Sequence, residues 1–212
     1  MIKGIIFDFD GVIVESVDIK TKAFLKLYEE YSENVKNKVL NHHLANGGMS
    51  RYEKFRYYHK EYLNIQLNDK EVAQLSNLFS KLVVKKVVDA PFVSGANDFL
   101  QKYNKKYDFF ISSATPEVEI RDIAHKKIIN KYFKGIYGSP ESKYSHIENI
   151  IRLYSYNRNE VVFIGDAQND LNAARKSGIK FIARILNNNS VLKNEEYLMD
   201  NLDELISIIK LI

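Results

Sequence analysis

The stretch FDFDGVIVES, Phe7 to Ser16, places two aspartates two residues apart at the end of an apolar run and follows them with a glycine. The run itself, residues 2–9, is almost continuously apolar, which is typical of a strand buried on both faces. Because side chains alternate along a strand, Asp8 and Asp10 should point the same way from its carboxyl end. Open parallel sheets bind their ligands at that end. The stretch therefore predicts a buried parallel strand with a polar site behind it.

Four later apolar stretches alternate with helical patterns, which predicts an α/β fold with a doubly wound parallel sheet. The expected strands cover residues 107–111, 135–137, 161–164 and 179–185. One helix is expected to begin after Thr115-Pro116 and to extend through Ile129 and Phe133. Two further helices are expected at residues 142–156 and 171–176, the second closed by Gly178.

Residues 15–86 break this alternation, because they show helical patterning without a convincing buried strand. We interpret them as an inserted all-helical cap domain, with residues 1–14 and 87–212 forming the α/β core domain. The glycine pair in NGGMSR, residues 46–51, suits a loop between two helices of the insert.

The composition is that of a folded protein with a mildly basic charge. Of 212 residues, 45% are hydrophobic and 12% aromatic, which is enough to bury a core. The net charge of +4 is concentrated in residues 15–86, with 13 Lys and Arg against 9 Asp and Glu. The excess fits either a solvated helical surface or a lid over an anionic substrate. It is too sparse to predict a nucleic-acid partner, even at KFRYYHK, residues 54–60.

Several classes of protein are disfavoured by what the sequence lacks. There is no apolar run of about 18 residues and no signal-type segment, so we expect a cytoplasmic protein without a membrane partner. The absence of cysteine excludes disulfides and thiolate chemistry. We expect a monomer by default.

The paired carboxylates predict a metal site. Two carboxylates as close as those of Asp8 and Asp10 repel each other unless a cation lies between them. The stretch VVFIGDAQNDLNAA, residues 161–174, repeats the pattern, because a buried strand ends in Gly-Asp and a second acid follows four residues later. Asp166 and Asp170 can thus complete a site for a hard, oxygen-preferring cation such as Mg²⁺.

Two further segments predict an anion site near the same edge of the sheet. FFISSATP, residues 109–116, is a strand that ends in the hydroxyls of Ser112 and Ser113, with a helix N-terminus behind it. GSPESKYSHIENII, residues 138–151, places Lys143 at the head of a helix.

With these four motifs in this order, the chain resembles the haloacid dehalogenase superfamily of phosphotransferases over nearly its whole length. The matching pieces are Asp8-Phe9-Asp10-Gly11-Val12, Ser112, Lys143, and Gly165-Asp166 with Asp170. The insert resembles the helical cap of the group that includes phosphoglycolate phosphatases and β-phosphoglucomutases. The resemblance implies a Rossmann-like core and phosphoryl transfer on a small phosphorylated metabolite. Gly138-Ser139-Pro140 departs from the Lys-Pro pattern common in that group.

The resemblance also implies roles for the motif residues. Asp8 would be the nucleophile, and Asp10 would protonate the leaving group and then activate water. Ser112 and Lys143 would bind the phosphoryl group, helped by backbone N–H groups near Gly11 and Ser113. Mg²⁺ would be held by the Asp8 carboxylate, the Asp10 carbonyl and Asp166, with Asp170 either a ligand through water or an orienting group.

Cap residues are expected to contact the leaving group. Arg51 is the main candidate, because a guanidinium can bind a phosphate or carboxylate at two points. Lys20 stands where mutases of the group often carry a histidine, which favours a phosphatase. His42 and His43 are expected at the cap surface, and no role is expected for His146.

Two other functions remain compatible with these residues. A sugar-phosphate mutase would share every catalytic residue and return the phosphoryl group to a sugar. A non-catalytic phosphate-binding protein could have kept the fold without the chemistry.

Overall fold

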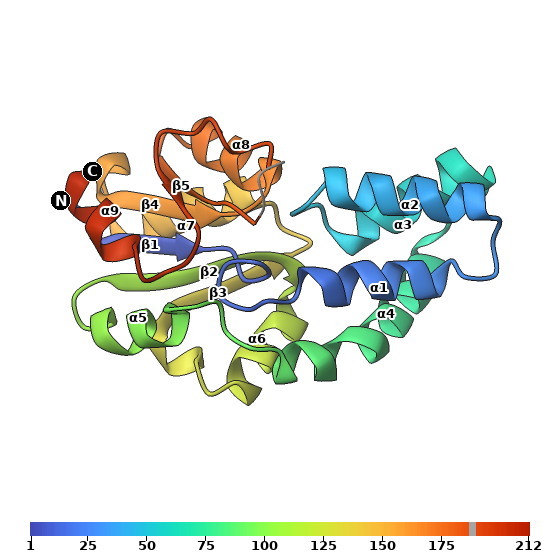
Figure 1. Cartoon of the computed structure of the whole chain (residues 1–212), viewed down its shortest axis with the longest axis horizontal. Helices are drawn as coiled ribbons and strands as arrows, with labels where there is room; N and C mark the ends of the chain where they lie inside the picture. Colours follow the sequence, from blue (N-terminus) through green and yellow to red (C-terminus); the bar gives the residue numbers. More distant parts are fainter. Residues whose placement is uncertain (187–189) are drawn as a thin grey trace.

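The computed structural model describes residues 1–186 and 190–212 and contains a parallel α/β sheet with a helical insert (Figure 1). Within these residues the sheet has six strands in the order β3-β2-β1-β4-β5-β6, and every strand pair is parallel. The strands are β1 (Gly4–Phe7), β2 (Asp108–Pro116), β3 (Phe133–Ser139), β4 (Val161–Gly165), β5 (Lys180–Arg184) and β6 (Leu198–Met199). The predicted fold class is confirmed, with the first predicted strand near the centre of the sheet.

Alternating side chains of the central strands supply two separate apolar cores, one on each face of the sheet. Ile5 and Phe7 of β1 belong to one core, whereas Ile6 belongs to the other. The first face is covered by α5 (Ala96–Tyr103), α6 (Glu117–Lys126) and α9 (Leu205–Leu211). The second is covered by α7 (Lys143–Tyr154) and α8 (Gln168–Lys176). Helices on both faces explain why the strands read as continuous apolar runs.

The helix predicted after Thr115-Pro116 is wrong in its limits. Thr115 still belongs to β2, and α6 begins at Glu117 without a side-chain cap at its start. The helix ends at Lys126, so Ile129 lies outside it and Phe133 begins β3. Both side chains pack on the core, which is why their spacing resembled a continuing helix.

Four helices form the insert between β1 and α5. They are α1 (Val17–Leu27), α2 (Glu33–Ala45), α3 (Arg51–Leu63) and α4 (Asp69–Asp89). Aromatic rings fill the space between them, and the ring centroids of Phe24 and Phe79 lie 4.5 Å apart. We call this unit the cap; the domain limits drawn from the sequence stay a prediction. His43, expected at the surface, is buried beside the Phe24 ring, so that expectation is wrong.

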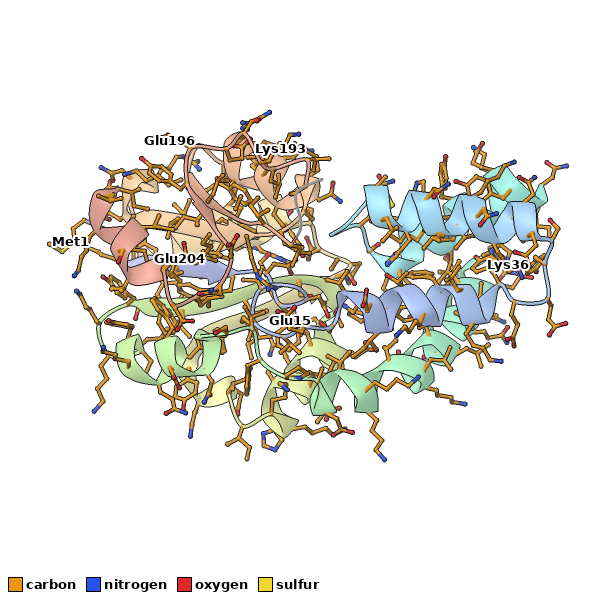
Figure 2. All side chains as sticks on the ribbon, viewed as in Figure 1. Met1, Glu15, Lys36, Lys193, Glu196 and Glu204 are labelled. Carbon is orange, nitrogen blue, oxygen red and sulfur yellow. The ribbon has the colours of Figure 1, made fainter. Side chains whose placement is uncertain are left out.

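The cap extends away from the carboxyl end of the sheet. Figure 2 shows Glu15 where the chain leaves the core for α1, and Lys36 toward the far end of the cap. The Glu15 carboxylate pairs with Arg184 at the end of β5, with a 2.6 Å contact from Nη2 to Oε1. This ion pair fixes the exit of the chain from the sheet. Among the described helices, none has the length and apolar character needed to cross a membrane.

Candidate active site

A pocket of about 400 Å³ lies between the carboxyl end of the sheet and the cap. Its core side includes Asp8 and Asp10, which follow β1, and Asp166, which follows β4. Its cap side includes residues of α1, α2, α3 and α4. The carboxyl ends of β1 and β4 and the cap therefore meet at one place.

Lys143 connects two of the predicted carboxylates. It is the first residue of α7, whose Ser142 cap accepts the Ser145 N–H at 3.1 Å. Lys143 Nζ lies 2.9 Å from Asp8 Oδ2 and also pairs with Asp170 Oδ1. The other Asp170 oxygen accepts the backbone N–H groups of Asp166 and Ala167, at 3.2 and 3.1 Å. Both Asp170 oxygens are thus engaged within the protein.

The donor set fits a divalent cation. Asp8, Asp166 and Asp170 each offer a carboxylate oxygen within 4.8 Å of the others. Burial and the neighbouring carboxylates raise the pKa of Asp8 to about 7, although the positive charge of Lys143 acts to lower it. Burial and the charges of Asp8 and Asp170 likewise raise the pKa of Asp166 well above its usual range. A cation among these oxygens would remove the repulsion, and Mg²⁺ prefers such ligands.

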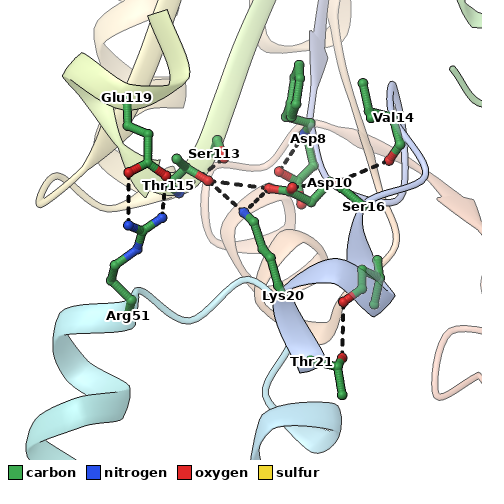
Figure 3. Close-up of polar contacts among 12 residues, drawn as sticks. Asp8, Asp10, Val14, Ser16, Lys20, Thr21, Arg51, Ser113, Thr115 and Glu119 are labelled. Atoms are coloured by element: carbon green, nitrogen blue, oxygen red, sulfur yellow. Dashed lines mark hydrogen bonds and ion pairs between the residues drawn. The ribbon is translucent and has the colours of Figure 1, made fainter. Parts of the chain in front are cut away.

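Asp10 has a different environment from Asp8. Its Oδ1 accepts the Ser16 hydroxyl at 2.6 Å, and its Oδ2 pairs with Lys20 Nζ (Figure 3). Burial alone would raise the pKa of Asp10, but the Lys20 charge and the hydrogen bonds from Lys20 and Ser16 outweigh burial and lower it. Lys20 Nζ also donates to Thr115 Oγ1 at 2.7 Å. The first cap helix thus contributes the cation that faces Asp10.

Gly11 permits the close approach of the β1 and β4 ends. Its φ of +76° favours glycine, and a Cβ atom there would overlap the Asp166 carboxylate. The Gly11 carbonyl oxygen accepts a hydrogen bond from Arg184 Nη1 at 2.8 Å.

The two serines after β2 make local contacts. Ser112 is fully buried, and its Oγ lies 2.8 Å from His146 Nδ1. Ser113 Oγ accepts the Thr115 N–H at 3.1 Å. This contact could not be predicted from the sequence, because His146 and Ser112 meet only when α7 packs on β2.

The loop between α2 and α3 lies against the core. A Cβ atom on Gly47 would be 3.0 Å from Ala167 Cβ, and one on Gly48 would be 3.5 Å from Lys143 Nζ. Gly48 has a φ of +75°. This glycine pair therefore lets the cap loop lie close to the start of α8 and to Lys143.

Arg51 lines the pocket, as expected, but its guanidinium is held by the protein. It pairs with Glu119 of α6 (Figure 3). It also donates to Ser80 Oγ of α4 at 2.8 Å. A second buried cation, Lys54, lines the same pocket and was missed in the sequence, where its basic neighbours suggested a solvated surface.

Comparisons with known proteins give one matching family and several structures of similar fold. The family model described as haloacid dehalogenase-like hydrolase matches residues 5–184. A predicted phosphatase from Clostridium acetobutylicum is 19% identical over 100% of both chains, with a TM-score of 0.76. A predicted phosphoglycolate phosphatase from Haemophilus somnus 129pt is 16% identical over 98% of both chains, also with a TM-score of 0.76.

A third similar structure contains a phosphorylated ligand. CbbY from Rhodobacter sphaeroides, in complex with xylulose-(1,5)bisphosphate, is 15% identical over 97% of this chain and 96% of its own, with a TM-score of 0.74. The search of curated proteins gave no match. At these identities the structures show the fold alone, whereas the family model spans most of the sequence. The chain therefore belongs to the haloacid dehalogenase-like hydrolases.

Proposed function

We propose that this hydrolase is a Mg²⁺-dependent phosphatase that cleaves a small phosphate monoester through an aspartyl-phosphate intermediate on Asp8. The observation that carries the proposal is the pairing of Lys143 with Asp8 and Asp170, where Asp8 lines one pocket together with Asp10. An ionised carboxylate needs no base to act as a nucleophile, and covalent catalysis divides the reaction into two easier steps.

In the first step, an Asp8 oxygen forms a bond to phosphorus as the ester oxygen leaves. Asp10, whose pKa Lys20 and Ser16 hold down before a substrate binds, has to take up a proton as the anionic ester enters; it then donates that proton to the ester oxygen, and the product alcohol departs. In the second step, Asp10 takes a proton from water, whose oxygen attacks the phosphorus and releases Asp8 and inorganic phosphate. Two acids after one strand therefore divide nucleophilic attack and proton transfer between them.

The remaining residues stabilise charge, on which phosphoryl transfer largely depends. Lys143, held between Asp8 and Asp170, offsets negative charge on the nucleophile and the phosphoryl group. Ser112 and the N–H groups near Gly11 and Ser113 would donate to phosphoryl oxygens. Asp8, Asp166 and the Asp10 carbonyl would hold Mg²⁺, which when bound supplies positive charge beside the phosphoryl oxygens. Because both Asp170 oxygens already have protein partners, we assign Asp170 the role of orienting Lys143.

Release of inorganic phosphate from a panel of phosphate monoesters tests the reaction class. We expect turnover of at least one ester with Mg²⁺ and its loss when EDTA is added, with recovery on restoring Mg²⁺. Isomerisation of a sugar phosphate without phosphate release would instead indicate a mutase. Binding of phosphate without turnover of any ester would indicate a non-catalytic protein.

A further inference from the structure

Lys54, on α3, is a buried lysine in the cap wall of the pocket. Lys54 is only 3% exposed, and it lines the pocket together with Phe24 and Phe79. Lys54 Nζ lies 2.8 Å from His43 Nδ1 and 3.4 Å from the His43 carbonyl oxygen. In the part of the chain that the structure describes, no salt bridge joins it to an acidic group.

The hydrogen bonds around His43 determine which of its nitrogens carries a proton. The Thr21 hydroxyl donates to the Val17 carbonyl at 3.0 Å, so its oxygen is left to accept from His43 Nε2 at 3.1 Å. His43 Nδ1 is then free of a proton and accepts a hydrogen bond from Lys54. Burial and the Lys54 charge lower the pKa of His43 to about 3, so the ring is neutral. His43 therefore positions the amine without neutralising a charge on it.

The other cations in or beside the pocket have acidic partners. Lys20 and Arg51 line the pocket and pair with Asp10 and Glu119, and Lys143, beside it, pairs with Asp8 and Asp170. These cations are compensated before a substrate binds.

Lys54 differs from them because its surroundings disfavour its charge. Burial and the nearby Lys20 lower its pKa to about 7, against a weaker opposing effect of Glu53. A buried cation without a counter-charge is costly, so an anion that entered the pocket beside Lys54 would gain a charge partner there.

The position of Lys54 determines which part of a bound substrate it would contact. Asp8 belongs to the core side of the pocket and Lys54 to its cap side. A phosphoryl group at Asp8 therefore has its leaving group directed toward the cap.

We propose that Lys54, positioned by His43, binds an anionic group on the leaving group of the phosphate ester. The anion is a carboxylate or a second phosphate, both of which accept hydrogen bonds from an ammonium. This inference rests on the proposed phosphatase function and makes Lys54, rather than the paired Arg51, the residue that selects a doubly anionic substrate.

Matched ester pairs test the inference by turnover. The carboxylate pair is 2-phosphoglycolate and 2-hydroxyethyl phosphate, and the phosphate pair is 1,3-propanediol bisphosphate and 3-hydroxypropyl phosphate. For the wild type we expect kcat/KM to be at least about tenfold higher for the charged member of one pair, which identifies the anion. In Lys54→Met this ratio should fall to near one. Lys60→Met, an exposed lysine on the same helix, should keep the wild-type ratio.

Equal ratios in the wild type and Lys54→Met, or no charge preference in the wild type for either pair, would overturn the assignment. A purely structural role for Lys54 would lower kcat/KM for both members of a pair and leave their ratio unchanged.

A second measurement does not depend on turnover. The Lys54 signal of a protein with ¹³C-labelled lysines is identified by its loss in Lys54→Met, and its pKa is then measured by titration. We expect 3-phosphonopropionate or 1,3-propanediylbisphosphonate to raise this pKa by at least about one unit, whereas ethylphosphonate should not. Charged groups near Lys54 that the titration must account for are Lys20, His43 and Glu53.

If none of the phosphonates changes the pKa of Lys54, the inference is overturned. If no ester is turned over but the pKa rises as expected, the phosphatase proposal fails while the anion site stands. If esters are turned over and the pKa does not move, the phosphatase proposal stands and Lys54 has another role.

Discussion

The Arg51 guanidinium, at the start of α3, and the Glu119 carboxylate, in the first turn of α6, form a two-point ion pair that joins the cap to the core. Arg51 Nη1 lies 2.9 Å from Glu119 Oε2, and the two side chains are only 4% and 10% exposed. The guanidinium also lies 4.5 Å from the Phe79 ring centroid. Because both charges are buried, each depends on the other to remain ionised at low cost.

Replacing one partner of this pair should therefore destabilise the protein strongly. Glu119→Gln leaves the buried Arg51 charge uncompensated, and we expect the free energy of unfolding in urea to fall by about 3 kcal/mol. Glu117→Gln is the matched control, because Glu117 pairs with Arg121 at the surface on the same helix. The control should change stability by less than about 1 kcal/mol. Equal effects of the two substitutions would show that the buried pair contributes no more than a surface one.

Gly11→Ala should weaken Mg²⁺ binding. The added methyl group would overlap the Asp166 carboxylate and must displace it, and the φ of +76° is also unfavourable for alanine. We expect the Kd for Mg²⁺, measured by calorimetry, to rise at least about tenfold. Gly178→Ala is the control, since Gly178 has a φ of +63° but its nearest neighbour, Arg158 Cδ, is 3.6 Å from a Cβ atom. Unchanged Mg²⁺ affinity in Gly11→Ala would contradict the assignment of Asp166 as a ligand.

The stability difference between Lys54→Met and the wild type should depend on pH. The pKa of Lys54 is about 7 in the folded protein, below its ordinary value of 10.5. Between these values only the unfolded chain binds the proton, so wild-type stability rises with pH; below about pH 7 both states are protonated and the unfavourable contribution is complete. We expect Lys54→Met to be more stable by about 2–4 kcal/mol at pH 7 and to lose most of this advantage by pH 10.

Chemical denaturation at pH 7, 8.5 and 10 measures this difference. Lys60→Met should differ from the wild type by a small amount that is constant across the range, because Lys60 is exposed. A pH-independent difference for Lys54→Met would mean that its amine keeps an ordinary pKa in the folded protein.

The parts of the site predicted from the sequence follow a local rule. Asp8, Asp10 and Asp166 each follow a strand of apolar residues, and parallel strands end at a shared edge. Their proximity therefore follows from the fold class alone. The strands themselves could be predicted because burial on both faces leaves a continuous apolar run.

The parts that were missed depend on packing between distant segments. Lys54 meets His43 only because α2 packs beside α3, and Arg51 meets Glu119 only because the cap docks on α6. In the sequence these residues look like exposed polar positions on helices. The edge strand β6 and the short helix α9 were also missed, because two and seven residues are too few to show a period.

The most direct test of the account is phosphate release by Asp8→Asn from the best ester, with Mg²⁺ present. The amide cannot form the aspartyl phosphate, so we expect turnover to fall at least about a thousandfold while the circular dichroism spectrum is retained. Asp98→Asn, which changes an exposed aspartate of α5, should keep wild-type turnover. Turnover by Asp8→Asn within tenfold of the wild type would contradict the assignment of Asp8 as the nucleophile and with it the proposed mechanism.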